Sequence, residues 1–177
     1  MDDELAELVD EARRAEAVAE RRRARWLAEE AVDGLTLAGA LAAMAGRDEA
    51  VVVVTVDGER RQGPVLAVGV DLVVLGGPVE RLVPLGAVSL VHADATLAAP
   101  TDGIGAGVRT ASVPATSLAD ALGALAAERW PVVVRASGAG PVRGRAWGAG
   151  DDVLVVRTDE GRLVHLALAA VCEVLLR

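Results

Sequence analysis

The sequence predicts a mainly β protein with two tandem, small five-stranded barrels, each preceded by a short helix, behind a long N-terminal helix. The segment GDDVLVVRTDEGRLVHL, residues 150–166, nearly repeats GVDLVVLGGPVERLVPL, residues 69–85, at an offset of 81 residues. Valine-rich runs predict strands, and glycines inside them predict the bends that close a small barrel. A chain of 177 residues with 53% hydrophobic content has room for two such units.

Residues 1–34 predict a charged helix, because apolar residues return at helical spacing at Leu5, Leu8, Ala12, Ala15 and Val18. The apolar stripe is narrow, so we expect the helix to dock on the barrels or on a second copy. A basic anchor for nucleic acid or lipid, made by the arginines between 21 and 25, is the alternative. It is disfavoured because the 11 acidic residues of this segment outnumber its 6 arginines.

The two predicted units span residues 35–92 and 117–177. Each begins with a capping residue, Thr36 or Ser117, and a short apolar helix, TLAGALAAMAG or SLADALGALAA. A valine-rich strand follows in each unit, and the Asp57-Gly58 pair is a hairpin signal. Residues 93–116 are rich in Gly, Pro, Ala and Thr and predict a linker.

The offset of 81 continues through the strands of the two units. It pairs Gly63 with Gly144 and Asp71 with Asp152, and it aligns ERLVPL at 80–85 with GRLVHL at 161–166. After Leu85 the best offset is 83, which places a two-residue insertion near the turn before the last strand.

With its leading helix, bent second strand and the pattern G-x5-G-x-D-x-V-x-L, each unit resembles the Sm-like family of small β-barrels, which includes Hfq and the LSm proteins. The whole chain also resembles actinobacterial proteins with a charged leading helix and two such units. The resemblance implies open edges at the fourth and fifth strands. Such edges pair with other strands, the sister repeat among them.

Family members that bind RNA use an Asp and Asn pattern in one turn and a basic turn before the last strand. Asp71 and Asp152 stand near the first turn, but the Asn is absent. The second turns, VPLGAV and HLALAAV, contain neither arginine nor an aromatic residue. RNA binding through these turns is therefore not expected.

The residues with chemical potential are predicted to be structural. His165 and His92 lie in strand patterns without a partner nearby, and Cys172 lies among apolar residues. One cysteine allows no internal disulfide and no zinc motif.

Asp151 and Asp152 could hold a cation, but aspartate is also common in turns. The GIGAG stretch at 103–107 lacks the strand and helix of a phosphate loop. We expect no catalytic residue, cofactor or metal, and therefore no enzyme.

These observations predict a non-enzymatic protein-interaction or scaffold module, with a protein partner or self-association. The alternative is an RNA-binding or ribosome-associated regulator that uses Arg60, Arg61, Arg143 and Arg145. A net charge of −8 disfavours nucleic acid unless the arginines form a contiguous patch. No apolar run approaches the roughly 20 residues of a membrane span, and the acidic start is unlike a secretory signal, so we expect a cytoplasmic protein.

Overall fold

The computed structural model describes residues 18, 20, 22–23, 36–47, 50–92 and 116–177. The chain divides into two units, Met1–Thr36 and Leu37–Arg177. In the first unit the four described residues before Thr36 are helical and exposed. The remainder of the predicted N-terminal helix lies outside the described residues, and so do residues 93–115 of the predicted linker at 93–116. Within the described part of the chain, no helix is long and apolar enough to cross a membrane.

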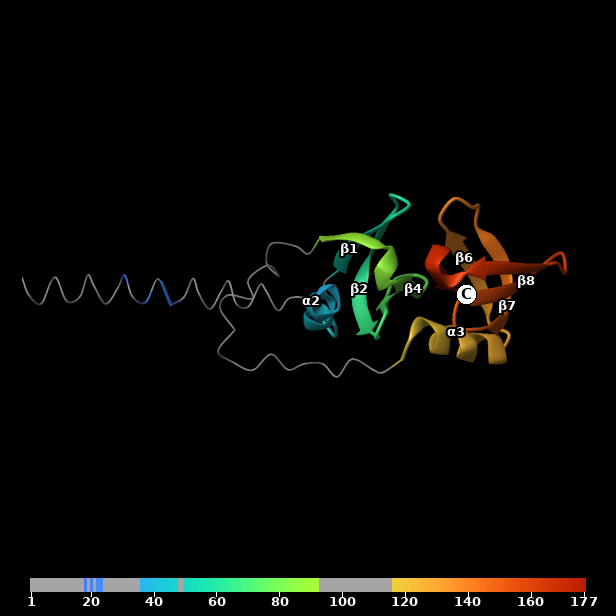
Figure 1. Cartoon of the computed structure of the whole chain (residues 1–177), viewed down its shortest axis with the longest axis horizontal. Helices are drawn as coiled ribbons and strands as arrows, with labels where there is room; N and C mark the ends of the chain where they lie inside the picture. The colour runs from blue at the N-terminus through green and yellow to red at the C-terminus, as the bar shows by residue number, and fades with distance from the viewer. Residues whose placement is uncertain (1–17, 19, 21, 24–35, 48–49, 93–115) are drawn as a thin grey trace, which may run out of the picture. The chain divides into compact units, whose positions relative to one another are not determined.

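The unit Leu37–Arg177 contains two halves with the same order of elements (Figure 1). The first half consists of α2 (Leu37–Met44), β1 (Ala50–Thr55), β2 (Arg60–Val68), β3 (Leu72–Leu75), β4 (Arg81–Pro84), the 3-10 turn η1 (Leu85–Ala87) and β5 (Val88–His92). The second half consists of α3 (Leu118–Ala127), β6 (Pro131–Ala136), β7 (Val142–Ala149), β8 (Val153–Thr158), β9 (Leu163–Ala167), the 3-10 turn η4 (Leu168–Ala170) and β10 (Val171–Leu176).

The expectation of two closed, Sm-like barrels was wrong. The ten strands form one open sheet in the order β5-β1-β2-β3-β4-β10-β6-β7-β8-β9, and every pairing is antiparallel. Strand β4 pairs with β10 across the two halves, so neither five-stranded group closes on itself. The edges of the sheet are β5 and β9.

Strand pairing relates the halves residue by residue. In β1 and β2, Val51 pairs with Gly63, and in β6 and β7, Val132 pairs with Gly144, which preserves the offset of 81. A side chain at either glycine would overlap a backbone carbonyl oxygen, that of Gly76 just after β3 or that of Arg157 in β8. The glycines therefore allow β2 and β7 to pass close to their neighbours.

The insertion of two residues is not where the sequence placed it. In the first half Leu72 pairs with Pro84, whereas in the second half Val153 pairs with Ala167. The partners of β3 and β8 thus differ by 83 residues instead of 81, because the β8–β9 hairpin is two residues longer. Consequently Arg81 corresponds to Val164 and Leu82 to His165, and the aligned letters RLV at 81–83 and 162–164 are structurally out of register.

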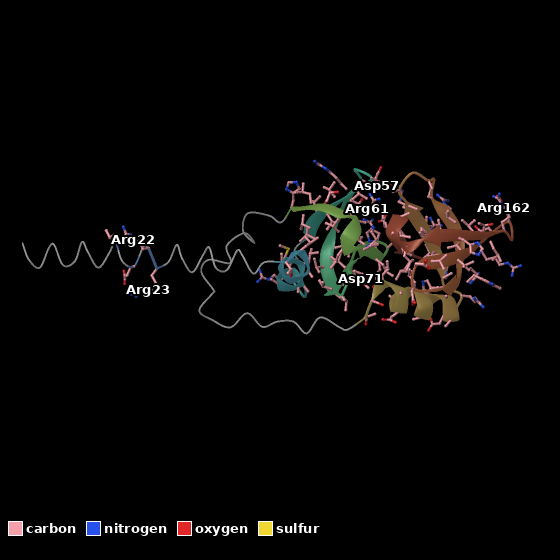
Figure 2. The ribbon with its side chains drawn as sticks, viewed as in Figure 1. Arg22, Arg23, Asp57, Arg61, Asp71 and Arg162 are labelled. Carbon is pink, nitrogen blue, oxygen red and sulfur yellow. The ribbon has the colours of Figure 1, made fainter. Side chains whose placement is uncertain are left out.

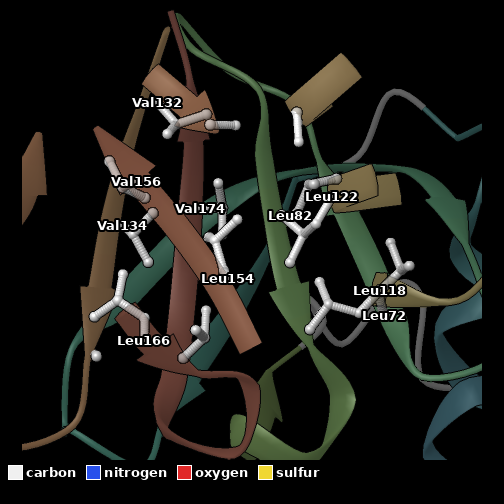
Figure 3. Packing of buried hydrophobic residues seen from close by; sticks show 14 residues of the cluster. Leu72, Leu82, Leu118, Leu122, Val132, Val134, Leu154, Val156, Leu166 and Val174 are labelled. Carbon is white, nitrogen blue, oxygen red and sulfur yellow. The ribbon is translucent and has the colours of Figure 1, made fainter. Parts of the chain in front are cut away.

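Two apolar cores lie against the helices. The first combines Leu41 of α2 with strands of the first half. The second combines Leu118 and Leu122 of α3 with β6 to β10, and it also includes Leu72 and Leu82 from the first half (Figure 3). The first half therefore contributes to the core of the second.

Helix α3 starts at a capping box. The Ser117 side chain accepts a hydrogen bond from the Asp120 backbone N–H, and the Asp120 carboxylate accepts one from the Ser117 backbone N–H. The Ser117 hydrogen bond lowers the pKa of Asp120. This reciprocal arrangement satisfies N–H groups that a helix start leaves without partners.

Candidate binding surfaces

The junction between the halves is made by backbone, carboxylate and apolar contacts. Leu82 pairs with Val174 and Arg81 with Leu175, and the Leu176 N–H donates to the Glu80 carbonyl over 2.9 Å. The Asp71 carboxylate accepts a 2.6 Å hydrogen bond from the Leu118 N–H at the start of α3. Asp71 of the first half thus caps a helix of the second.

A buried ion cluster lies at this junction. Glu173 of β10 is 1% exposed, and its carboxylate lies 2.8 Å from Arg61 Nε of β2. Arg81 of β4 and Arg135 of β6 each approach the same carboxylate to 3.5 Å. Arg61 also contacts Glu59 at 3.2 Å and is shown beside Asp57 in Figure 2. The contacts of Arg61 Nε and Arg81 Nε lack hydrogen-bond geometry, so charge attraction holds this cluster more than directed hydrogen bonds do.

Beside the cluster, Asp57 and Cys172 have opposite pKa shifts. Burial raises the pKa of the Cys172 thiol, and the negative charge of Asp57 raises it further. Burial opposes ionisation of Asp57 as well, but hydrogen bonds from the Thr55 side chain and the Glu59 backbone, with Arg61 nearby, hold its pKa below the usual range. A protonated, buried thiol is a poor nucleophile.

The outer face of β7 and β8 carries a second cluster. The Arg129 guanidinium lies 3.9 Å and the Arg157 guanidinium 4.9 Å from the centre of the Trp147 ring. Trp147 stands at a bulge between the pairs that Ala146 and Gly148 make with β8. A bulge redirects a side chain, and here the redirected ring carries two cations.

Backbone and hydrogen bonds fix this arrangement. Arg129 has φ 55°, the one positive value found for a non-glycine residue among the described residues. Its guanidinium donates to the Trp147 carbonyl, and its own carbonyl accepts a 3.2 Å bond from Arg145. Left-handed backbone at a non-glycine residue is costly and is found preferentially at binding sites.

The cluster is exposed and mostly cationic. Arg143, Arg145 and Trp147 alternate with buried residues along β7, and Arg145 pairs with Arg157 of β8. Trp130 is exposed, and its carbonyl accepts from the Ala146 N–H. We call these residues the Arg–Trp surface: Arg129, Trp130, Arg143, Arg145, Trp147 and Arg157.

The first half lacks such a surface at the corresponding positions. At the offset of 81 that pairing confirms for β2, β3, β7 and β8, Gln62 corresponds to Arg143, Pro64 to Arg145 and Leu66 to Trp147. Gly76 corresponds to Arg157. The Arg–Trp surface is therefore a feature of the second half and not a requirement of the repeated fold.

The four arginines proposed from the sequence do not form one site. Arg143 and Arg145 lie on the Arg–Trp surface, and Arg60 is exposed on β2. Arg61 is buried and paired with Glu173, so it is unavailable to a ligand.

The remaining candidates are dispersed. His92 and His165 are exposed on the edge strands β5 and β9, and Asp151 and Asp152 are exposed in the β7–β8 turn. Among the described residues no group of three or more His, Cys, Asp or Glu could hold a metal ion. The GIGAG segment lies outside the described residues.

Sequence reasoning missed Arg129, Trp130, Trp147 and Arg157. A comparison of the halves at the offset of 81 contained the signal for this surface. It aligns Leu66 with Trp147 and Gly76 with Arg157, so the tryptophan and the arginine occur in the second half alone.

No family model matches the chain, and no curated protein or solved structure matches it. The resemblance to Sm-like proteins thus receives no support from these comparisons, and the open ten-stranded sheet contradicts it.

Proposed function

We propose that this protein is a non-enzymatic interaction module and that its Arg–Trp surface binds single-stranded nucleic acid. The observation that carries the proposal is the stacking of Arg129 and Arg157 on the exposed Trp147 ring, at 3.9 and 4.9 Å. Proteins that bind single strands combine cationic contacts to phosphates with aromatic rings on which bases stack.

The geometry supports both kinds of contact, cationic groups for phosphates and aromatic rings for bases. Stacking on a tryptophan orients a guanidinium while its N–H groups remain open to phosphate. None of the four arginines of the surface forms an ion pair with a carboxylate of the described residues. Trp130 offers a second exposed ring next to them.

The net charge of −8 acts against a polyanion. Binding should therefore depend on local contacts and fall steeply with salt. If up to four phosphates are neutralised, log K should fall with log salt with a slope of about −2 to −3, at about −0.7 per phosphate for single strands.

Fluorescence anisotropy with labelled oligo-U and oligo-dT tests the proposal. The full chain should bind at low salt, and Trp147→Leu, which installs the residue found at position 66, should weaken binding about tenfold. Arg157→Gln should weaken binding and make the salt slope shallower by about 0.7. Arg60→Gln, a change of the same charge away from the surface, should leave affinity within about twofold. No saturable binding at low salt, or equal losses in Arg60→Gln, would refute the proposal.

A protein-interaction scaffold is the second candidate. It is favoured by the two strands, β5 and β9, that pair on one side only. In either role we propose a cytoplasmic location, which fractionation of cells that express the protein at natural levels would test.

A further inference from the structure

The internal junction is a pattern for a second, intermolecular junction. Strand β4 of the first half pairs with β10 of the second. By the structural correspondence, β9 matches β4 and β5 matches β10, and these are the two edges of the sheet. We propose that β9 of one copy of the chain docks on β5 and the start of α2 of another copy, repeating the β4–β10 junction between chains. Such a junction uses no residue of the Arg–Trp surface and does not depend on nucleic-acid binding.

The ion cluster of the internal junction has a fully apolar counterpart. Glu173 corresponds to Leu90, since each stands opposite the matching residue of β6 or β1. Its three arginine partners correspond to valines: Arg61 to Val142, Arg81 to Val164 and Arg135 to Val54.

The replacements of the charged residues by apolar ones are correlated, although they fall on two sides of the sheet that do not meet within one chain. Leu90 and Val54 lie on the β5 side, whereas Val142 and Val164 lie on the β9 side. Leu90 facing an arginine, or Glu173 facing a valine, would leave a buried charge without a partner. Instead, the glutamate on one side and the arginines on both sides are all replaced by apolar residues. This joint replacement is what contact between the two edges requires.

Exposure of apolar residues at the same positions supports this contact. Leu118 is 4% exposed because Leu72 and Leu82 of the first half pack beside it. Its counterpart Leu37 is 38% exposed, and Leu90 is 47% exposed. The side that matches an internal interface therefore presents uncovered leucines.

The helix-capping contact also has a counterpart. Asp71 caps α3 through the Leu118 N–H. Asp152 stands in a turn with the same backbone bonds, because the carbonyls of Asp71 and Asp152 each accept a 2.8 Å bond, from Leu85 and Leu168. In the proposed junction Asp152 would accept from the Leu37 N–H of the other copy.

One position differs in character. Leu82, which packs into the core of the second half, corresponds to the exposed His165. The apolar part of the intermolecular contact therefore rests on the exposed Leu90 and Leu37 and on Val142 and Val164, which are partly buried against the core of the second half.

The contact joins two different surfaces of the same chain, so it is heterologous. Each copy then uses its β9 edge to contact one neighbour and its β5 edge to contact another. The assembly therefore grows into a ring or a filament unless an edge is blocked.

Substitutions that copy charges of the internal cluster onto the edges test the proposal on the full chain, by light scattering after size exclusion. Wild type should form assemblies of two or more copies at about 100 μM, above the micromolar range of weak interfaces. Leu90→Glu places a charge on one edge and Val142→Arg places a charge on the other, so each should shift the protein toward monomer. The double variant should recover assembly, because it recreates the Arg61–Glu173 pair between copies.

A mixture of the two single variants should also recover assembly, because one junction joins two unaltered edges and the next joins the two altered edges, which carry opposite charges. Leu66→Glu is the matched control and should assemble like wild type, because Leu66 is as exposed as Leu90, 47%, but lies on β2, which pairs with a strand on each side. Unchanged melting temperatures would show that the variants fold.

Hydrogen exchange of the wild type gives an independent measurement. Amides of β5 and β9 should exchange more slowly as the protein concentration rises. A wild type that stays monomeric at about 100 μM, assembly unaffected by Leu90→Glu, or exchange in both edges that ignores concentration would overturn the proposal.

Discussion

Replacing Glu173 by leucine tests how the ion cluster holds the halves together. The substitution removes the one acid shared by three arginines. Arg81 and Arg135 can turn toward water, because their side chains are 22% and 43% exposed. Arg61 is buried, and its loss of a partner dominates the cost.

Breaking one partner out of a buried pair costs about 3–5 kcal/mol. Arg61 retains Glu59 at 3.2 Å and Asp57 at 3.9 Å, so we expect a loss near the lower limit, about 3 kcal/mol. Replacing the whole cluster by its counterparts, with Arg61→Val, Arg81→Val and Arg135→Val added to Glu173→Leu, should remove most of this loss, because apolar replacement of a buried ion network is often neutral or stabilising.

Urea unfolding measures the free energy of unfolding of both variants. An unchanged slope m would show that a shifted midpoint reports a change in stability alone. A loss below about 1 kcal/mol for Glu173→Leu would place the cluster among weak surface ion pairs. A quadruple variant less stable than Glu173→Leu would refute the claim that the apolar residues found at the β5 and β9 edges can form a junction like that between β4 and β10.

Other predictions concern single contacts. Ser117→Ala should destabilise the protein by about 1 kcal/mol through loss of the α3 cap. It should also flatten the acid dependence of stability, because the lowered pKa of Asp120 gives a contribution that is present at neutral pH and is lost as pH falls through the folded pKa, below the ordinary value of about 3.9. Cys172→Ala should cost about 1 kcal/mol in thermal or urea unfolding. Because burial raises the pKa of Cys172, wild type should lose stability relative to this variant as pH rises above about 8.5, and a disulfide reagent should react with the thiol slowly until the protein unfolds.

The repeat could be read from the sequence, but its register could not be read throughout. Matching identical residues aligned Arg81 with Arg162. The hairpin between β8 and β9 is two residues longer than its counterpart in the first half, so the residue structurally equivalent to Arg81 is Val164. Strand register is set by turn length and pairing, which identical letters do not reveal. The error concealed the correspondence between Arg81, one of the three arginines around Glu173, and Val164.

Pairing between distant strands explains the other failures. The repeated glycines and valines predict bent strands, but they do not say whether β4 meets its own half or β10. Likewise, the acidic residue in VCEVLL at 171–176 has partners from β2, β4 and β6, and no local pattern connects them. The Arg–Trp surface joins Arg129, just beyond α3, to two strands, so its signal was a difference between the halves and not a motif.

Three glycine-to-alanine substitutions separate close strand approach from conformational freedom. At Gly63 and Gly144 an added methyl group would overlap the carbonyl oxygen of Gly76 or Arg157, and backbone atoms have little room to move. Each substitution should cost at least about 1–3 kcal/mol, as overpacking does. Gly123 lies inside α3 with nothing within 4 Å of an added methyl group, and Gly123→Ala should stabilise the protein by about 0.5–1 kcal/mol. The first half already has Ala42 at the corresponding position of α2. Urea unfolding of the three variants should therefore give two losses and one gain. If Gly144→Ala were as stable as wild type, β7 and β8 could separate without cost, and the close approach that aligns Arg145 with Arg157 would not be a constraint of this sheet.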